Sequence, residues 1–470
     1  MKELNDLIYT LKTLKWDKNI YIIILYIYMD IPYILISTKK YANLNEYQKF
    51  NSFYVYYNDN FSNQFIMIND LLFFGYIIDP FSPNKNNISI VEELEKIPYT
   101  EYDFFKVMSK YSGRFLIIKN NICFTDTCGQ LQTFYYKKNN NFIICSSQKL
   151  ISILEPDYTI NKDKKTIIDA QREFYGYEGI IDNSFLILPN HYLDINKKSL
   201  IRYSTLSYYH SDKPNIDKIV KILEGNFKAI VSRFGKNIQM GLTGGRDTRC
   251  LLGFAGKYNN KITFFHGFSG NNKELNISKK LVKHMDLKFD EINLKKHNPS
   301  KEFINFYNSN RFIPYYSYIP VKSNLKYYMY KNNRNCMLIT GTCAEIYRNF
   351  YGIKDINNYL ELMHSTRTVK HKKNLYFLNF LKKYYNLSSR HCNNNISIND
   401  LFYWEQRLGF WNGSNSEEYN LFGNVFIPFN NRNLINEMLL FENNDRTTCN
   451  HYNEILKYIG RDDLLEFSYS

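Results

Sequence analysis

The sequence predicts a two-domain protein, in which a sheet-rich α+β domain (residues 1–205) precedes an α/β domain with a parallel sheet (residues 206–470). A chain of 470 residues exceeds what one hydrophobic core usually supports. Up to about residue 200, short runs of Ile, Tyr and Phe alternate with turn residues, as β-strands do. After about residue 214, strand-like runs alternate with segments of helical spacing, which favours parallel strands joined by crossover helices.

The most apolar stretch of the chain, residues 20–38, is interrupted by Asp30 and Pro32 before it reaches membrane-spanning length. We therefore expect two strands joined by a turn there and no membrane span. The pattern predicts further strands at 53–57, 114–119, 141–147 and 184–188 in the first domain. In the second it predicts helices at 214–235, 248–258 and 274–285, and strands at 236–242 and 261–268.

Charge and cysteine usage narrow the class of protein. The formal net charge is +15, but the 60 Lys and Arg residues are dispersed, so we expect solvated faces and no nucleic-acid partner, whereas an acidic substrate remains possible. The eight cysteines form no CxxC pair, which argues against structural zinc and a disulfide framework. The first residues lack the order of a signal peptide. A cytoplasmic location is the expectation.

One glycine-containing loop, TGGRDT at residues 243–248, stands between a predicted buried strand and a predicted helix. Glycines let backbone N–H groups approach a phosphate, and a helix N-terminus favours an anion. Thr243 and Thr248 add hydroxyl groups, and Asp247 can hold the Mg²⁺ that accompanies a polyphosphate. The loop lacks the spacing and lysine of a Walker loop. We interpret it as a pyrophosphate site, although a ligand-free tight turn is the simpler alternative.

The loop resembles the SGGxDS pyrophosphate loop of the ATP-pyrophosphatase group, with Thr in place of both serines. Other segments resemble, in the same order, parts of the asparagine-synthetase-like family. Residues 113–154 and 176–196 resemble its class II glutamine-amidotransferase-type sheet domain, residues 338–352 its Gly-Asp/Glu-Gly-x-Asp-Glu loop, and residues 424–439 its Arg-x-Pro-Phe-x-Asp segment. The resemblance covers about residues 65–465.

The resemblance implies ATP and Mg²⁺ as cofactors, with Mg²⁺ on Asp247 and Glu345. It implies an adenine site at the end of a strand, near backbone groups of Phe265, His266 and Gly267, although a lone His there is as often a packing residue. The residues expected to bind ATP are Leu242, Thr243, Gly244, Gly245, Arg246, Asp247, Thr248, Phe265, His266, Gly267, Gly341 and Thr342.

The candidate catalytic residues are Asp247, Glu345, Arg446 and Lys457. Glu345 is expected to bind Mg²⁺ or deprotonate an amine, and its alternative role is that of a glutamate at a helix N-terminus. Arg446 and Lys457 are candidates for the catalytic lysine of the family, which has no clear counterpart here.

Glutamine-dependent relatives use an N-terminal cysteine as nucleophile, whereas this chain begins Met1-Lys2-Glu3 and its first cysteine is Cys123. We therefore expect no glutaminase activity, as in the β-lactam synthetases and lasso-peptide cyclases. The predicted function is an ATP-dependent ligase that adenylates a small-molecule or peptide carboxylate and forms an amide or lactam. A peptide substrate would call for a partner protein that delivers it. The alternatives are ammonia-dependent amidation of the asparagine-synthetase type and a catalytically degenerate protein that binds a nucleotide or a partner.

Overall fold

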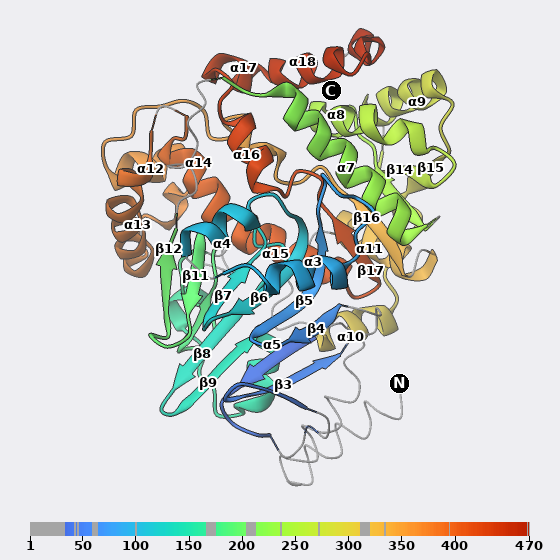
Figure 1. The fold of residues 1–470 in the computed structure, drawn as a ribbon. Coiled ribbons are helices and arrows are strands. Elements are labelled where there is room, and N and C mark those ends of the chain that lie inside the picture. Colours follow the sequence, from blue (N-terminus) through green and yellow to red (C-terminus); the bar gives the residue numbers. More distant parts are fainter. Residues whose placement is uncertain are drawn as a thin grey trace.

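The computed structural model describes most of the chain (Figure 1), namely residues 33–41, 44, 47–58, 64–98, 101–165, 175–203, 213–235, 237–270, 273–310, 320–332, 335–393, 395–467 and 469. The first of the two strands expected within residues 20–38 lies outside these residues, and so does the predicted domain boundary at 205/206. The second expected strand is present as β1 (Tyr33–Ser37).

Two six-stranded antiparallel sheets form the N-terminal half. The first has the order β10-β8-β9-β1-β3-β2, and the second has the order β12-β11-β7-β6-β5-β4. The remaining strands of the first sheet are β2 (Gln48–Phe50), β3 (Phe53–Asn58), β8 (Phe134–Lys138), β9 (Asn141–Cys145) and β10 (Ser184–Leu186). The second sheet consists of β4 (Phe65–Ile68), β5 (Leu71–Ile78), β6 (Ser112–Lys119), β7 (Ile122–Thr125), β11 (His191–Asp194) and β12 (Ser199–Arg202). The four strands predicted after residue 50 are thus confirmed.

Because side chains alternate between the two faces of each strand, one face of each sheet is free to pack against the other sheet. On β5, Leu72 and Phe74 join a core shared with Ile34 of the other sheet, whereas Leu71 and Phe73 face the opposite side. That opposite side is covered by α3 (Asn87–Glu95) and α4 (Glu101–Met108). The outer face of the first sheet packs against α5 (Gln148–Leu154). The N-terminal half is therefore a helix–sheet–sheet–helix sandwich.

A parallel five-stranded sheet organises the C-terminal half, in the order β15-β14-β13-β16-β17. Its strands are β13 (Ile238–Gly241), β14 (Ile262–Phe268), β15 (Phe289–Asn293), β16 (Cys336–Ile339) and β17 (Gly423–Phe426). The order reverses at β13, because β14 and β15 add on one side of it and β16 and β17 on the other. In open α/β sheets, ligands bind at the carboxyl ends of the strands that flank such a reversal.

Helices surround the parallel sheet, and Figure 1 shows many of them at the end of the molecule opposite β3, β8 and β9. The three predicted helices are confirmed as α7 (Ile216–Phe234), α8 (Arg246–Ala255) and α9 (Lys273–Met285), although α8 begins two residues earlier than expected because Gly245 is its N-cap. The other longer helices are α10 (Lys301–Ser309), α11 (Pro320–Asn332), α12 (Tyr359–Ser365), α13 (Leu375–Ser388), α14 (Ile398–Phe402), the π-helix η7 (Tyr403–Asn412), α15 (Gly413–Tyr419), α16 (Arg432–Met438), α17 (Asn443–Thr448) and α18 (Asn450–Tyr458). In the part of the chain that is described, none of the helices could cross a membrane.

The two halves share a polar and tightly packed boundary. Asn430, just beyond β17, accepts a hydrogen bond from the backbone N–H of Cys128 (2.9 Å) and donates to the carbonyl oxygen of Gly113 (2.8 Å). The Trp404 indole donates to the Thr127 carbonyl oxygen (2.9 Å). On α7, Gly225 lies so close to Pro80 that a Cβ atom would overlap the Pro80 carbonyl oxygen. A side chain at Gly225 would therefore push the halves apart.

Substitution Gly225→Ala tests this boundary through the sign of its effect. Helix propensity alone predicts that Ala stabilises a helix by about 1 kcal/mol relative to Gly. Because backbone must shift to admit the new methyl group, we expect instead a loss of about 2 kcal/mol or more in the free energy of unfolding, measured by urea denaturation. Gly270→Ala, at an exposed position where an added Cβ atom meets no atom within 4 Å, is the control and should change stability by less than about 1 kcal/mol. A stabilised Gly225→Ala protein would contradict the packing argument.

Candidate functional site

The loop after β13 is closed by its own hydroxyl groups. The Thr243 and Thr248 hydroxyl oxygens are 2.9 Å apart, and the backbone N–H of Gly245 donates to Thr243 Oγ1 (3.2 Å). Helix α8 starts at Arg246, so its N-terminal N–H groups begin within the loop. The loop thus combines small residues, hydroxyl groups and a helix N-terminus at the strand where the sheet order reverses.

The loop after β16 lies directly against the first loop. A Cβ atom built on Gly341 would stand 3.5 Å from Thr248 Cγ2 and 3.7 Å from Asp247 Cβ. The Thr340 and Thr342 hydroxyl oxygens are 3.0 Å apart. Cys343 has a φ of 75°, a left-handed conformation that favours glycine. The second loop therefore turns sharply beside the first and brings Glu345 towards it.

Two carboxylates and one guanidinium meet between the loops. Arg348 Nη1 lies 3.3 Å from Asp247 Oδ2, and Arg348 Nη2 lies 3.8 Å from Glu345 Oε1. The other two carboxylate oxygens, Asp247 Oδ1 and Glu345 Oε2, are buried without a hydrogen-bond partner among the described residues. Burial raises the pKa of both carboxyl groups, the Asp247 charge adds to the rise at Glu345, and Arg348 opposes both shifts. Arg348 therefore pairs with both desolvated acids, while Arg246 and Tyr452 also favour the ionised form of Asp247 and Tyr403 that of Glu345.

The two orphaned oxygens fit a small divalent cation. Mg²⁺ typically takes one or two protein carboxylates and completes its octahedron with water and substrate phosphates. Within the described ranges, no group of three or more His, Cys, Asp or Glu side chains could hold a metal. These residues therefore do not form a site in which such side chains alone enclose the ion. Asp247 and Glu345 could hold a metal that arrives with a phosphate ligand.

The residues predicted for the adenine side lie on β14, next to the first loop. The Leu242 N–H donates to the Phe265 carbonyl oxygen (2.8 Å), and His266 Nδ1 is 2.7 Å from the Leu242 carbonyl oxygen. His266 is buried and also lies 3.3 Å from the Ser278 hydroxyl group. Gly267 packs against Leu294. In this arrangement His266 holds the two strand ends together, which agrees with the packing alternative for this residue.

Arg446, one of the predicted catalytic candidates, makes its contacts within the packed segment after Glu345. Its side chain is buried and donates to the carbonyl oxygens of Ile346 (2.9 Å) and Tyr347 (3.1 Å), with Asp400 at 3.1 Å as its ion-pair partner. Because these contacts engage the whole guanidinium, Arg446 stabilises the segment after Glu345. Lys457 is exposed on α18, and within the described chain no hydrogen bond or ion pair joins it to either loop.

Two features of this site were missed by the sequence reasoning. Arg348 was not singled out, although its position three residues after Glu345 is a spacing at which helical side chains meet. The second feature is Tyr469 near the C-terminus. Its ring centre lies 4.5 Å from the Arg246 guanidinium and 4.0 Å from that of Arg249, whose Nη2 donates to the Gly244 carbonyl oxygen (3.2 Å). Arg249 therefore joins the first loop to the segment around Tyr469.

No protein-family model and no curated protein matches this sequence. The site must therefore be interpreted from its own residues.

Proposed function

We propose that this protein is a cytoplasmic, ATP-dependent ligase that adenylates a substrate carboxylate and then forms an amide or lactam, with release of AMP and pyrophosphate. The observation that carries the proposal is the pair of orphaned carboxylate oxygens, on Asp247 and Glu345, between two loops at the reversal point of a parallel sheet. A turn without a ligand gives no reason to bury two carboxylates beside a helix N-terminus.

In the proposed reaction, a carboxylate oxygen of the substrate bonds to the α-phosphorus of ATP while the bond from that phosphorus to the bridging oxygen breaks. The leaving pyrophosphate is stabilised by backbone N–H groups of the TGGRDT loop and the N-terminus of α8. An amine then bonds to the acyl carbon, AMP leaves, and the amine loses a proton. Glu345, with its raised pKa, is our candidate for the proton acceptor.

Asp247 and Glu345 are the proposed ligands of Mg²⁺, which neutralises phosphate charge when bound. Arg348 contacts both carboxylates, and we assign to it the positive charge that the sequence left without a residue. A planar guanidinium presents several donors to phosphate or carboxylate oxygens. The proposal thus places the needed cation on the loop of Glu345 and not near the C-terminus.

The resemblance to the asparagine-synthetase-like family stays part of this proposal, and one position in the second loop supports it. The family pattern of the second loop has a glycine where this chain has Cys343, and the left-handed φ of Cys343 is one that glycine adopts readily. We assign the helix–sheet–sheet–helix half to the class II amidotransferase type, without glutaminase activity. Cys123 and Cys145 are buried there and burial raises the pKa of their thiols, which opposes thiolate chemistry.

One observation favours the degenerate nucleotide-binding alternative. Arg348 forms ion pairs with both proposed metal ligands and so neutralises part of the charge that attracts Mg²⁺. If Arg348 keeps these contacts when ATP binds, the protein would hold a nucleotide without turning it over.

Isotope exchange between labelled pyrophosphate and ATP separates these alternatives before any amine is known. The protein is incubated with Mg-ATP, labelled pyrophosphate and single carboxylates, and hydroxylamine then traps an activated acyl group as its hydroxamate. We expect exchange and hydroxamate that depend on one class of carboxylate and vanish when EDTA removes Mg²⁺. Formation of ADP and phosphate would contradict adenylation. ATP binding without exchange for every carboxylate would favour the degenerate alternative.

A further inference from the structure

A cavity of about 770 Å³ lies between the sandwich half and α13 of the C-terminal half, and none of its lining residues belongs to the two loops. Strands β8, β10, β11 and β12 contribute to its walls near the edges of the two antiparallel sheets, the segment before β10 contributes Tyr177 and Glu178, and α13 with the turn after it supplies the rest. Cavities of this size accommodate small organic molecules.

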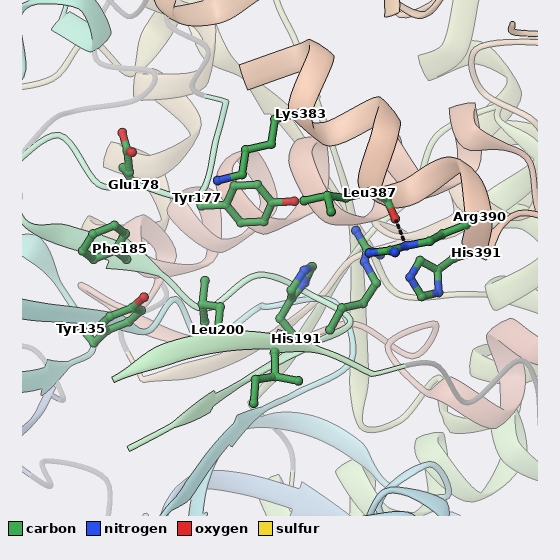
Figure 2. Close-up of a pocket in the computed structure, with 12 residues that line it drawn as sticks. Tyr135, Tyr177, Glu178, Phe185, His191, Leu200, Lys383, Leu387, Arg390 and His391 are labelled. Carbon is green, nitrogen blue, oxygen red and sulfur yellow. Dashed lines mark hydrogen bonds between the residues drawn. The ribbon is translucent and has the colours of Figure 1, made fainter. Parts of the chain in front are cut away.

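The lining of this cavity differs from one end to the other. Figure 2 shows Tyr135 and Phe185 at one end and Arg390 and His391 at the other, with His191 between them. The rings of Tyr135 and Phe185 stack with their centres 5.0 Å apart. The cavity therefore offers an aromatic surface at one end and a basic surface at the other.

Cations outnumber carboxylates in the lining, which holds Arg202, Lys383 and Arg390 against Glu178 alone. Glu178 already pairs with Lys164 (2.9 Å) and accepts a hydrogen bond from the Tyr376 hydroxyl group (2.9 Å). Its negative charge is therefore largely compensated from outside the cavity.

The basic end retains hydrogen-bonding capacity. Arg390 uses its Nε–H for the Leu387 carbonyl oxygen (3.2 Å), and no ion pair within the described ranges occupies its Nη groups. Arg202 is paired with the buried Glu405. Burial, together with the nearby Arg202 charge, lowers the pKa of His191 to about 4 and also lowers that of His391. Burial is the main cause of both shifts and Glu405 opposes them, so the positive charge of this end comes from Arg390 and not from the two imidazoles.

We propose that this cavity binds an organic carboxylate with an apolar body, with the carboxylate at Arg390, the body on Tyr135, Phe185 and Leu200, and Lys383 adding positive charge to the lining. Charge complementarity selects the anion, and the stacked rings select an apolar chain or ring over a simple inorganic ion.

Calorimetric titration with octanoate, 4-phenylbutanoate and octylammonium at neutral pH tests the proposal. The double variant Lys383→Gln/Arg390→Gln removes both exposed cations, and Lys382→Gln, the exposed neighbour on α13 that does not line the cavity, is the matched control. We expect the two carboxylates to bind and the Kd of octanoate to rise about tenfold in the double variant and to stay within about twofold in the control. Leu387→Glu should also abolish octanoate binding, because it adds a carboxylate inside the cavity.

Three results would overturn the proposal. The first is octylammonium binding as tightly as octanoate, which would indicate an apolar surface without charge selection. The second is an unchanged Kd in the double variant, since the carboxylate would then lie elsewhere. The third is no saturable binding of either carboxylate up to about 1 mM, the weak limit of specific recognition. Because the titration needs no ATP, these outcomes are independent of the proposed ligase activity.

Discussion

Arg202→Met is expected to lower the free energy of unfolding by about 3–5 kcal/mol, because it leaves Glu405 buried without its counter-charge. Glu405 is fully buried on η7 and accepts further hydrogen bonds from Asn190 (3.0 Å) and from the Tyr384 hydroxyl group (2.9 Å). Those neutral donors cannot replace a cation. Urea denaturation at neutral pH measures the loss, and Lys197→Met, which removes an exposed ion pair with Asp194, is the control with an expected loss below about 1 kcal/mol.

The pH dependence of this effect has a definite sign. Burial alone would raise the pKa of Glu405, but Arg202, His191 and Asn190 hold it below the usual value of 4.5. The ion pair therefore stabilises the wild-type protein at pH values above that usual pKa, and its contribution is lost as the pH falls through the lower folded-state pKa. In Arg202→Met the pKa of Glu405 rises, so acidification protonates the buried carboxyl group and reduces the difference between variant and wild type. A difference that grows between pH 7 and pH 5 would contradict this account.

The same ion pair illustrates which features of the fold the sequence predicts and which it does not. The strands and helices around the first loop follow from local patterns, because alternation and helical spacing are properties of consecutive residues. Their parallel direction also follows, since strands joined by crossover helices run the same way in the sheet. The partner of Glu405, by contrast, is 203 residues away on strand β12, and no pattern in the sequence joins them.

In the candidate site, too, some features follow from consecutive residues and others depend on the tertiary structure. The TGGRDT loop could be recognised because its glycines, hydroxyl groups and acid are contiguous. Arg348 could not be ranked above the other basic residues, because its significance depends on the pairing of β13 with β16, which brings the loop of Asp247 beside its own. Arg446 was selected for its charge near the C-terminus, and its real contacts with Ile346 and Tyr347 are set by the packing of α17. The catalytic roles of Asp247 and Glu345 stay predictions.

Glu345→Gln is expected to reduce carboxylate-dependent pyrophosphate exchange at least about 100-fold and, at the same time, to stabilise the nucleotide-free protein by about 1 kcal/mol. The loss follows from removing a proposed Mg²⁺ ligand and proton acceptor. The gain follows because burial and the Asp247 charge raise the pKa of Glu345, so holding it ionised at neutral pH costs folding free energy. An amide of the same shape avoids that cost, and it lets Arg348 serve Asp247 alone.

The direction of the Glu345 pKa shift determines how the stability gain of Glu345→Gln depends on pH. Since the folded-state pKa of Glu345 lies above its usual value, ionisation reduces stability progressively as the pH rises from the usual value to the folded one. The stability gain of Glu345→Gln should therefore be absent in acid and complete above the folded pKa. Thermal unfolding with and without Mg-ATP measures both effects. A ligand that binds only the folded state adds about 2.7 kcal/mol to the free energy of unfolding when its concentration is 100 times its Kd, and it therefore raises the Tm. We expect a higher Tm without ligand and a smaller Mg-ATP shift than in the wild type, with Glu302→Gln, an exposed acid on α10, unchanged in both. A variant with wild-type exchange would remove Glu345 from the reaction, and one with a lower Tm in the absence of ligand would show that the ionised carboxylate is already satisfied by Arg348.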